Sequence, residues 1–142
     1  MLPFPINCSH LIKKETTMKH VLLIDDNEID NYITKHIISK SNMAQKISTQ
    51  SSAIDALKFL GTLKNDHGEF PDNIFLDIQM PEMDGFGFLE EFKNFPEAIH
   101  DQCKVIMLTS SSDQQDIDRS FQYPFVKKFL NKPLTLSMLE DL

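Results

Sequence analysis

Two patterns of apolar and polar residues alternate along most of the chain. Short apolar runs rich in branched residues are typical of parallel strands that are covered on both faces, whereas apolar residues three or four positions apart indicate helices. The short runs predict five strands, and these occupy residues 20–24, 46–49, 73–77, 105–108 and 125–130. The stretches that follow them predict helices over residues 26–41, 51–63, 85–95, 112–121 and 134–142.

The helical stretches differ in how strongly they are marked. In residues 26–41, Ile29, Ile33 and Ile37 recur at helical spacing, and either Asp26 or Asn27 is available as the N-cap. Residues 112–121 are polar and offer few apolar anchors. We therefore expect the second of these helices to be the more loosely packed.

Strand and helix alternate five times, which predicts an α/β fold with a mainly parallel sheet. Right-handed crossovers place helices on both faces of such a sheet. In open sheets of this kind, ligands bind beyond the carboxyl ends of the strands, where the strand order reverses. The residues that end each strand are therefore where we look for chemistry.

Residues 1–17 follow neither pattern. They include two prolines and a polar stretch from Lys13 to Thr17, and Met18 comes directly before the first strand. We expect residues 1–17 to be an N-terminal extension outside the fold, and residues 18–142 to form a single domain. A chain that begins at Met18 should then keep its thermal stability.

Composition narrows the range of partners. The formal net charge of −7 repels phosphate backbones, so we expect no direct contact with nucleic acid.

No apolar run approaches the roughly 20 residues that span a bilayer, which excludes membrane insertion. The N-terminal stretch makes a poor signal peptide, and we expect a cytoplasmic protein. Cys8, Cys103 and the five histidines show no metal-binding spacing.

Polar residues end four of the five predicted strands. They are Asp25 and Asp26, then Asp77, then Thr109, then Lys132. Taken singly, each has an ordinary explanation as a helix cap, a turn residue or a solvated charge. Their joint occurrence, each at a strand end, predicts that three carboxylates, a hydroxyl and an ammonium group meet on one rim.

Such a combination suits phosphoryl transfer. Three neighbouring carboxylates repel one another unless a cation lies among them, and Mg²⁺ prefers oxygen ligands. One carboxylate can then act as a nucleophile and form an aspartyl phosphate. Phosphoryl transfer depends mostly on positioning and charge stabilisation, and Lys132 and Thr109 are suited to hold the phosphoryl oxygens.

Four motifs resemble those of response regulator receiver domains, and the resemblance covers about residues 18–142. The resemblance implies a flavodoxin-like (βα)5 fold with strand order 2-1-3-4-5. It also implies a signalling phosphoacceptor rather than an enzyme, although receiver domains take part in their own phosphorylation and dephosphorylation. A histidine kinase or histidine phosphotransfer protein would supply the phosphoryl group, and a downstream protein would receive the signal. The motifs are Ile24-Asp25-Asp26-Asn27, Phe75-Leu76-Asp77-Ile78-Gln79-Met80-Pro81-Glu82-Met83-Asp84-Gly85, Met107-Leu108-Thr109-Ser110 and Asn131-Lys132-Pro133.

The resemblance also implies roles for the metal-site residues. Asp77 would be the phosphoacceptor and a ligand of Mg²⁺ or Mn²⁺. Asp26 would bind the ion directly, and Asp25 through water or as a supporting charge. The backbone carbonyl of Gln79 would be a further ligand.

On the other side of the site, the resemblance implies that Thr109 and Lys132 bind the phosphoryl group. Thr109 and Phe129 would form a switch pair, although Phe129 has a simpler explanation as a core residue. Small Ser110 would leave the site accessible, and the residues at Gln79 and Ser111 would influence how long the phosphorylated state lasts. A cis peptide bond is expected before Pro133.

Two other functions fit an α/β sheet with these residues less well. A phosphatase with an aspartyl nucleophile usually has a second acid two residues after it, where this chain has Gln79. A flavin-binding electron carrier needs a glycine- or hydroxyl-rich phosphate loop after the first strand. Here the sequence Asp25-Asp26-Asn27-Glu28 would repel the phosphate. The receiver-domain interpretation is therefore favoured over both.

Overall fold

The computed structural model describes residues 18–142, so the expectation of an N-terminal extension over residues 1–17 lies outside the described residues. Five strands form one parallel sheet in the order β2-β1-β3-β4-β5, which confirms the predicted fold and strand order. The strands are β1 (Met18–Ile24), β2 (Ala44–Gln50), β3 (Asn73–Leu76), β4 (Lys104–Thr109) and β5 (Val126–Asn131).

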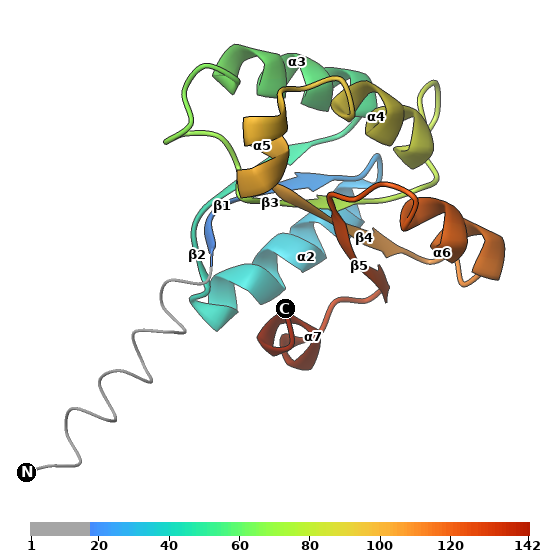
Figure 1. Ribbon diagram of the computed structural model, residues 1–142. Coiled ribbons are helices and arrows are strands. Elements are labelled where there is room, and N and C mark those ends of the chain that lie inside the picture. Colours follow the sequence, from blue (N-terminus) through green and yellow to red (C-terminus); the bar gives the residue numbers. More distant parts are fainter. Residues whose placement is uncertain (1–17) are drawn as a thin grey trace, which may run out of the picture.

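Helices cover both faces of this sheet (Figure 1). Figure 1 shows α3, α4 and α5 above one face and α2 and α7 below the other. The helices are α2 (Glu28–Ser41), α3 (Ala53–Leu63), α4 (Gly85–Phe92), α5 (Glu97–Gln102), α6 (Gln114–Ser120) and α7 (Leu136–Glu140). None of these helices within residues 18–142 has the length and apolarity needed to span a membrane.

Each face of the sheet has its own apolar core. Successive side chains of a strand point to opposite faces, so Leu22 and Ile24 of β1 pack on the α3 and α4 side while Val21 and Leu23 pack on the α2 and α7 side. All four are buried. Burying a side chain of this size contributes about 2 kcal/mol. Because both faces are covered, the strand has no polar alternation and is recognisable as a continuous apolar run.

The helix predicted over residues 26–41 is present, but Ile29 and Ile33 do not lie on its buried face. Ile29 is 69% exposed and Ile33 is 43% exposed. The buried positions are instead Asn31, Thr34 and Ile38. The helix is rotated in this way because its first turns face the polar end of the sheet, where an amide at position 31 has hydrogen-bond acceptors.

The helix predicted over residues 85–95 ends earlier, at Phe92, and the unexpected helix α5 follows it. Proline disfavours helical geometry in the residue before it, so Pro96 prevents α4 from continuing and stands at the N-cap of α5. Phe95 still packs on Phe92, with ring centroids 5.2 Å apart. The other predicted bounds differ from the observed ones by at most two residues at either end.

The register of the sheet positions its carboxyl edge. Ile24 of β1 is paired with Leu76 of β3, so the next residues, Asp25 and Asp77, are neighbours. The Asp77 N–H donates to the Ile24 carbonyl at 3.1 Å. The chain leaves β1 toward β2 on one side and β3 lies on the other, which makes this the point where the strand order reverses. At the amino-terminal ends of the strands, on the opposite side of the sheet from Asp77, exposed residues 64–69 lead from α3 toward β3.

Candidate functional site

Three aspartates meet at the carboxyl end of the sheet, as predicted. Asp25 and Asp26 follow β1, and Asp77 follows β3. One carboxylate oxygen from each lies within 4.8 Å of the others. Asp25 and Asp77 are buried, at 6% and 7% exposure, whereas Asp26 is exposed. The three acids therefore line a site that opens to solvent on the Asp26 side.

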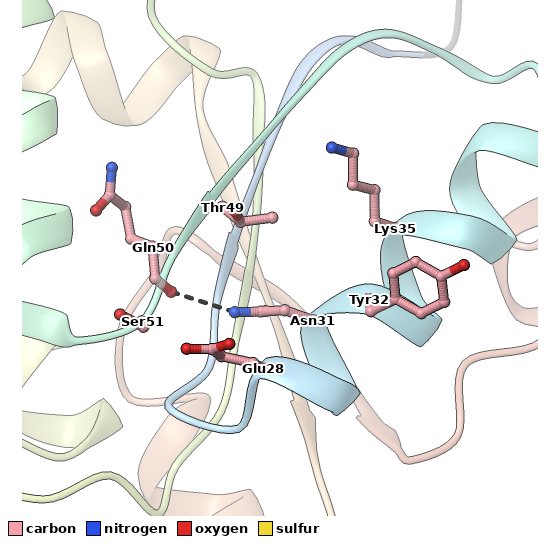
Figure 2. Close-up of a pocket in the computed structure, with 7 residues that line it drawn as sticks. All are labelled: Glu28, Asn31, Tyr32, Lys35, Thr49, Gln50 and Ser51. Atoms are coloured by element: carbon pink, nitrogen blue, oxygen red, sulfur yellow. Dashed lines mark hydrogen bonds between the residues drawn. The ribbon is translucent and has the colours of Figure 1, made fainter.

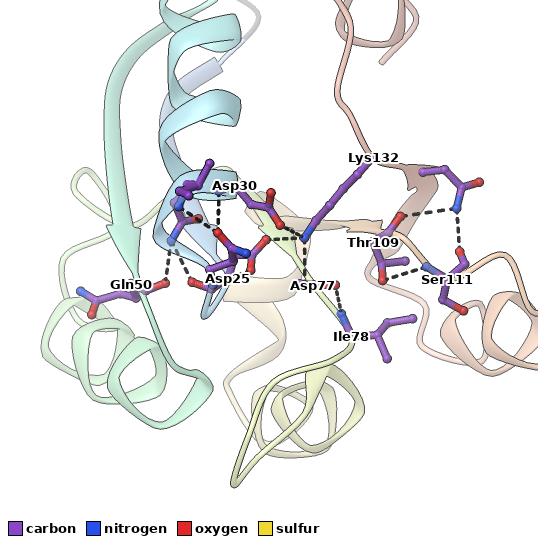
Figure 3. A network of polar contacts seen from close by, with 12 residues as sticks. Asp25, Asp30, Gln50, Asp77, Ile78, Thr109, Ser111 and Lys132 are labelled. Carbon is purple, nitrogen blue, oxygen red and sulfur yellow. Dashed lines mark hydrogen bonds and ion pairs between the residues drawn. The ribbon is translucent and has the colours of Figure 1, made fainter.

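Lys132 reaches across this group from the segment that follows β5 (Figure 3). Its Nζ donates to Asp25 Oδ2 at 2.6 Å, to Asp30 Oδ2 at 2.8 Å and to Asp77 Oδ2 at 3.0 Å. A lysine ammonium has three protons, so each proton of Lys132 has a carboxylate partner. The structure thus brings Lys132 to the aspartates, as predicted.

Asp30 is the member of this network that the sequence analysis missed. It lies in the first turn of α2, and its side chain is 34% exposed. An acidic residue in the first turn of a helix is common because it suits the helix dipole. Its only distinguishing feature in the sequence is therefore its place five residues after Asp25, on a helix that begins at the site.

Backbone hydrogen bonds hold the other oxygens of the two buried aspartates. Asp25 Oδ1 accepts from the Asn27 N–H at 2.9 Å, and Asp77 Oδ1 accepts from the Ile78 N–H at 2.8 Å. The Asn27 side chain in turn caps α2 by accepting from the N–H groups of Ile29 and Asp30. Each buried carboxylate thus has one oxygen fixed by the backbone and the other turned toward Lys132.

Asn31 connects the site to β2, the outer strand of the sheet. Its Nδ2 donates to the Asp25 carbonyl at 2.9 Å and to the Gln50 carbonyl at 3.5 Å. Asn31 is one of the residues that line a groove of about 390 Å³ between α2 and the end of β2. Figure 2 shows its amide pointing to the Gln50 carbonyl. These contacts explain why a polar residue occupies the buried face of α2 at this position.

Burial and pairing act in opposite directions on the charges of the site. Burial raises the pKa of Asp25, and the Asp77 charge adds to the rise, while hydrogen bonds from Lys132 and Asn27 oppose it. Burial also disfavours the charged form of Lys132, but its hydrogen bonds to the three carboxylates outweigh burial and raise its pKa above the ordinary value. Lys132 is therefore a stable cation facing several carboxylates.

The donor set fits a hard divalent cation. Carboxylate oxygens are the ligands that Mg²⁺ and Mn²⁺ prefer. Asp25, Asp26, Asp30 and Asp77 together carry more negative charge than Lys132 can balance. The oxygens of Asp25, Asp26 and Asp77 converge closely enough to hold such an ion, and Asp30 lies outside that group.

The loop after Asp77 is tightly folded. Gly85 N–H donates to the Ile78 carbonyl at 2.8 Å, and Asp84 caps α4 by accepting from the Gly87 N–H at 2.8 Å. A Cβ at position 85 would lie 2.5 Å from the Asp77 carbonyl oxygen. Only glycine leaves room for the backbone of Asp77 here. The side chain of Gln79, in the same loop, is exposed.

Thr109 and Phe129 lie on the neighbouring strands. Thr109 ends β4 and is fully buried, and its Oγ1 accepts from the Ser111 N–H at 3.3 Å. Its carbonyl accepts from the Lys132 N–H at 2.9 Å. Phe129 of β5 is partly buried and packs against the core on the α3 and α4 side. Ser110 is exposed, and the bond between Lys132 and Pro133 is cis, as the resemblance implied.

Known proteins share both the sequence pattern and the fold. The family model described as the response regulator receiver domain matches residues 21–142. Response regulator Rcp1 of Synechocystis is 26% identical over 85% of this chain and 81% of its own length. The rice two-component response regulator ORR13 (Oryza sativa subsp. japonica) is 28% identical over 83% and 89%.

Solved structures of response regulators have the same fold as this chain. A two-component response regulator from Cytophaga hutchinsonii superposes with a TM-score of 0.82 at 30% identity, over 88% of this chain and 93% of that one. The phosphorylated cyanobacterial phytochrome response regulator RcpA superposes with a TM-score of 0.68 at 26% identity, over 87% and 86%. With its acidic cluster and lysine placed at the carboxyl edge of a 2-1-3-4-5 sheet, the chain belongs to the response regulator receiver domains of two-component signalling.

Proposed function

We propose that Asp77 accepts a phosphoryl group in a reaction that requires Mg²⁺ or Mn²⁺. The observation that carries this proposal is the convergence of Asp25, Asp26 and Asp77 with Lys132 at the point where the strand order reverses. Receiver domains are signalling phosphoacceptors that interact with histidine kinases or phosphotransfer proteins. The similarity to a response regulator solved in its phosphorylated form supports the same chemistry for this chain.

In the proposed reaction, a carboxylate oxygen of Asp77 attacks the phosphorus of a phosphohistidine. An O–P bond forms, the N–P bond breaks, and the imidazole leaves with the electron pair of that bond. The bound divalent cation would neutralise charge on the phosphoryl oxygens. Lys132, already 3.0 Å from Asp77 Oδ2, is placed to pair with one phosphoryl oxygen, and the Thr109 hydroxyl is suited to bind another.

The direct test uses acetyl phosphate and Mg²⁺ with the purified protein. We expect intact-mass spectrometry to show one added phosphoryl group, and peptide mapping after borohydride trapping to place it on Asp77. Labelling elsewhere, or no labelling with Mg²⁺ present, would overturn the proposal.

Exposed apolar side chains beside the site support a protein phosphodonor. Ile29 and Tyr32 of α2 are 69% and 72% exposed, and Ile33 is exposed on the same helix. Large apolar side chains gathered on a surface often mark a protein interface. We propose that a histidine kinase or histidine phosphotransfer protein docks over this helix, and that the signal then passes to a downstream protein.

The metal-site proposal predicts that the two aspartates after β1 contribute unequally. Asp26 presents an exposed carboxylate, whereas Asp25 Oδ2 is held by Lys132. Changes to supporting residues of a metal site cost about tenfold to 100-fold in affinity. We expect Asp25→Ala to weaken Mg²⁺ binding by about tenfold and Asp26→Ala by more than that, as measured by calorimetry. Equal affinities for Asp26→Ala and the unmodified chain would contradict the assignment of Asp26 as a direct ligand.

The switch proposal links Thr109 to Phe129. A phosphoryl group on Asp77 would draw the Thr109 hydroxyl toward the site and leave space into which the partly buried Phe129 ring can turn. We expect Thr109→Ala to retain some phosphorylation of Asp77 but to lose the response at Phe129. Fluorine NMR of a label at Phe129, with and without beryllofluoride, measures this response. An unchanged Phe129 signal in the unmodified protein would leave Phe129 as a core residue.

A further inference from the structure

Asp30 lies outside the four receiver-domain motifs of the chain. Its carboxylate accepts from Lys132 at 2.8 Å, but it is not one of the three acids whose oxygens converge within 4.8 Å. The partners of Lys132 are therefore of two kinds. Asp25 and Asp77 form ion pairs with Lys132 and are also members of the acidic cluster. Asp30 forms an ion pair with Lys132 but is not a member of that cluster.

We propose that Asp30 is a positioning residue that keeps Lys132 at the rim when a divalent cation occupies the acidic cluster, an inference that rests on the proposed function. A divalent cation and the Lys132 ammonium compete for the same two carboxylates, those of Asp25 and Asp77. The cation has twice the charge and attracts those carboxylates more strongly. Asp30 is then the partner that Lys132 retains.

The position of Asp30 suits this task. Its backbone N–H donates to the Asn27 side chain at 3.1 Å, in the N-terminal cap of α2. The backbone of Asp30 is therefore held in place. Its side chain is 34% exposed, whereas those of Asp25 and Asp77 are 9% and 8% exposed. Lys132 can therefore move outward toward Asp30 without leaving the rim, and from there it can still reach a phosphoryl group on Asp77.

The same geometry has consequences for metal binding. Without Asp30, the ammonium would have only Asp25 and Asp77 as partners in the network and would compete harder with the cation for them. Asp30→Asn should therefore weaken Mg²⁺ binding, and the effect should act through Lys132. An ion pair that merely fastens α2 to the segment after β5 would change the unfolding temperature without this link.

The test is a Mg²⁺ titration of the full chain by calorimetry with five variants. Coupling between contacting residues typically corresponds to about twofold to 100-fold in an equilibrium constant. We expect Asp30→Asn to weaken Mg²⁺ binding by about fivefold, and Asp30→Glu to restore most of it. In a Lys132→Met background, adding Asp30→Asn should have little effect, because the competing ammonium is gone. Glu28→Gln, which removes the same charge from the same exposed turn of α2, is the matched control and should leave the affinity nearly unchanged.

A spectroscopic measurement follows Lys132 directly. In ¹⁵N-detected NMR of the lysine ammonium groups, we expect the Lys132 signal to stay protected from exchange when Mg²⁺ is added to the unmodified protein. In Asp30→Asn, the same addition should remove that protection. Loss of protection in the unmodified protein would overturn the inference, because Lys132 would then leave the rim despite Asp30.

The outcomes separate this inference from the proposed function. If the unmodified protein binds Mg²⁺ and is phosphorylated on Asp77 while Asp30→Asn titrates identically, only the role of Asp30 is overturned. An equal loss of affinity with and without Lys132 would mean that Asp30 acts on the cation directly, which also overturns the inference. If the unmodified protein neither binds Mg²⁺ nor becomes labelled, the proposed function fails and the inference fails with it.

Discussion

Asp77→Asn is expected to reduce phosphorylation by acetyl phosphate from one group per chain to none. The amide keeps the size and shape of the carboxylate, and its oxygen can still accept from the Ile78 N–H. It lacks the negative charge that makes the carboxylate a nucleophile, so the O–P bond cannot form. Intact-mass spectrometry after reaction with acetyl phosphate and Mg²⁺ measures the loss.

Loss of fold would not explain this result. Asp77 is buried next to Asp25, and removing one of two neighbouring negative charges relieves repulsion between them. We therefore expect the unfolding temperature of Asp77→Asn, followed by circular dichroism, to equal or exceed that of the unmodified chain. Asp101→Asn, an exposed aspartate on α5, is the control and should be labelled normally. Undiminished labelling of Asp77→Asn would place the acceptor elsewhere.

Gly85→Ala is expected to lower the free energy of unfolding by about 2–3 kcal/mol, which is typical of an atom forced into a packed site. The added Cβ would lie 2.5 Å from the Asp77 carbonyl oxygen and 2.9 Å from Ile78 Cα. Both are backbone atoms, so neither can turn aside as a flexible side chain would. The loop that carries Asp77 into the site would have to move away from α4.

Gly61→Ala is the matched control for this change. Gly61 lies in α3, and nothing stands within 4 Å of where its Cβ would be. Alanine is favoured over glycine in helices by about 0.5–1 kcal/mol, so this variant should be slightly more stable than the unmodified chain. Urea denaturation compares the two variants. If Gly85→Ala proved as stable as Gly61→Ala, the close approach of Gly85 to Asp77 would not be the constraint that the structure indicates.

The fold and much of the site could be predicted because their signals are local. A strand covered on both faces leaves a continuous apolar run such as residues 21–24, which four residues suffice to reveal. The strand-end rule then placed Asp25 and Asp77 together without any knowledge of side-chain geometry. The structure confirms that these two residues and Lys132 meet.

The features that the sequence did not predict depend mostly on contacts between segments far apart in the chain. Asp30 and Lys132 are 102 residues apart in the chain, and periodicity along one helix contains no information about that pair. The buried face of α2 was likewise missed, because the isoleucine spacing favours the face of Ile29 and Ile33, whereas the carbonyls that bind Asn31 lie on other segments. Helix α5 is a different case, since Pro96 gave a local signal that residues 85–95 could not be one continuous helix.

The exposed connection at residues 64–69 makes the protein suitable for conversion into a sensor. It lies at the amino-terminal edge of the sheet, between α3 and β3, and so at the end of the strands opposite Asp77. Exposed loop tips of this kind accept inserted domains and new chain termini. A fluorescent protein inserted there would be joined to β3, the strand that leads directly into Asp77. It would cover neither the acidic cluster nor the exposed face of α2.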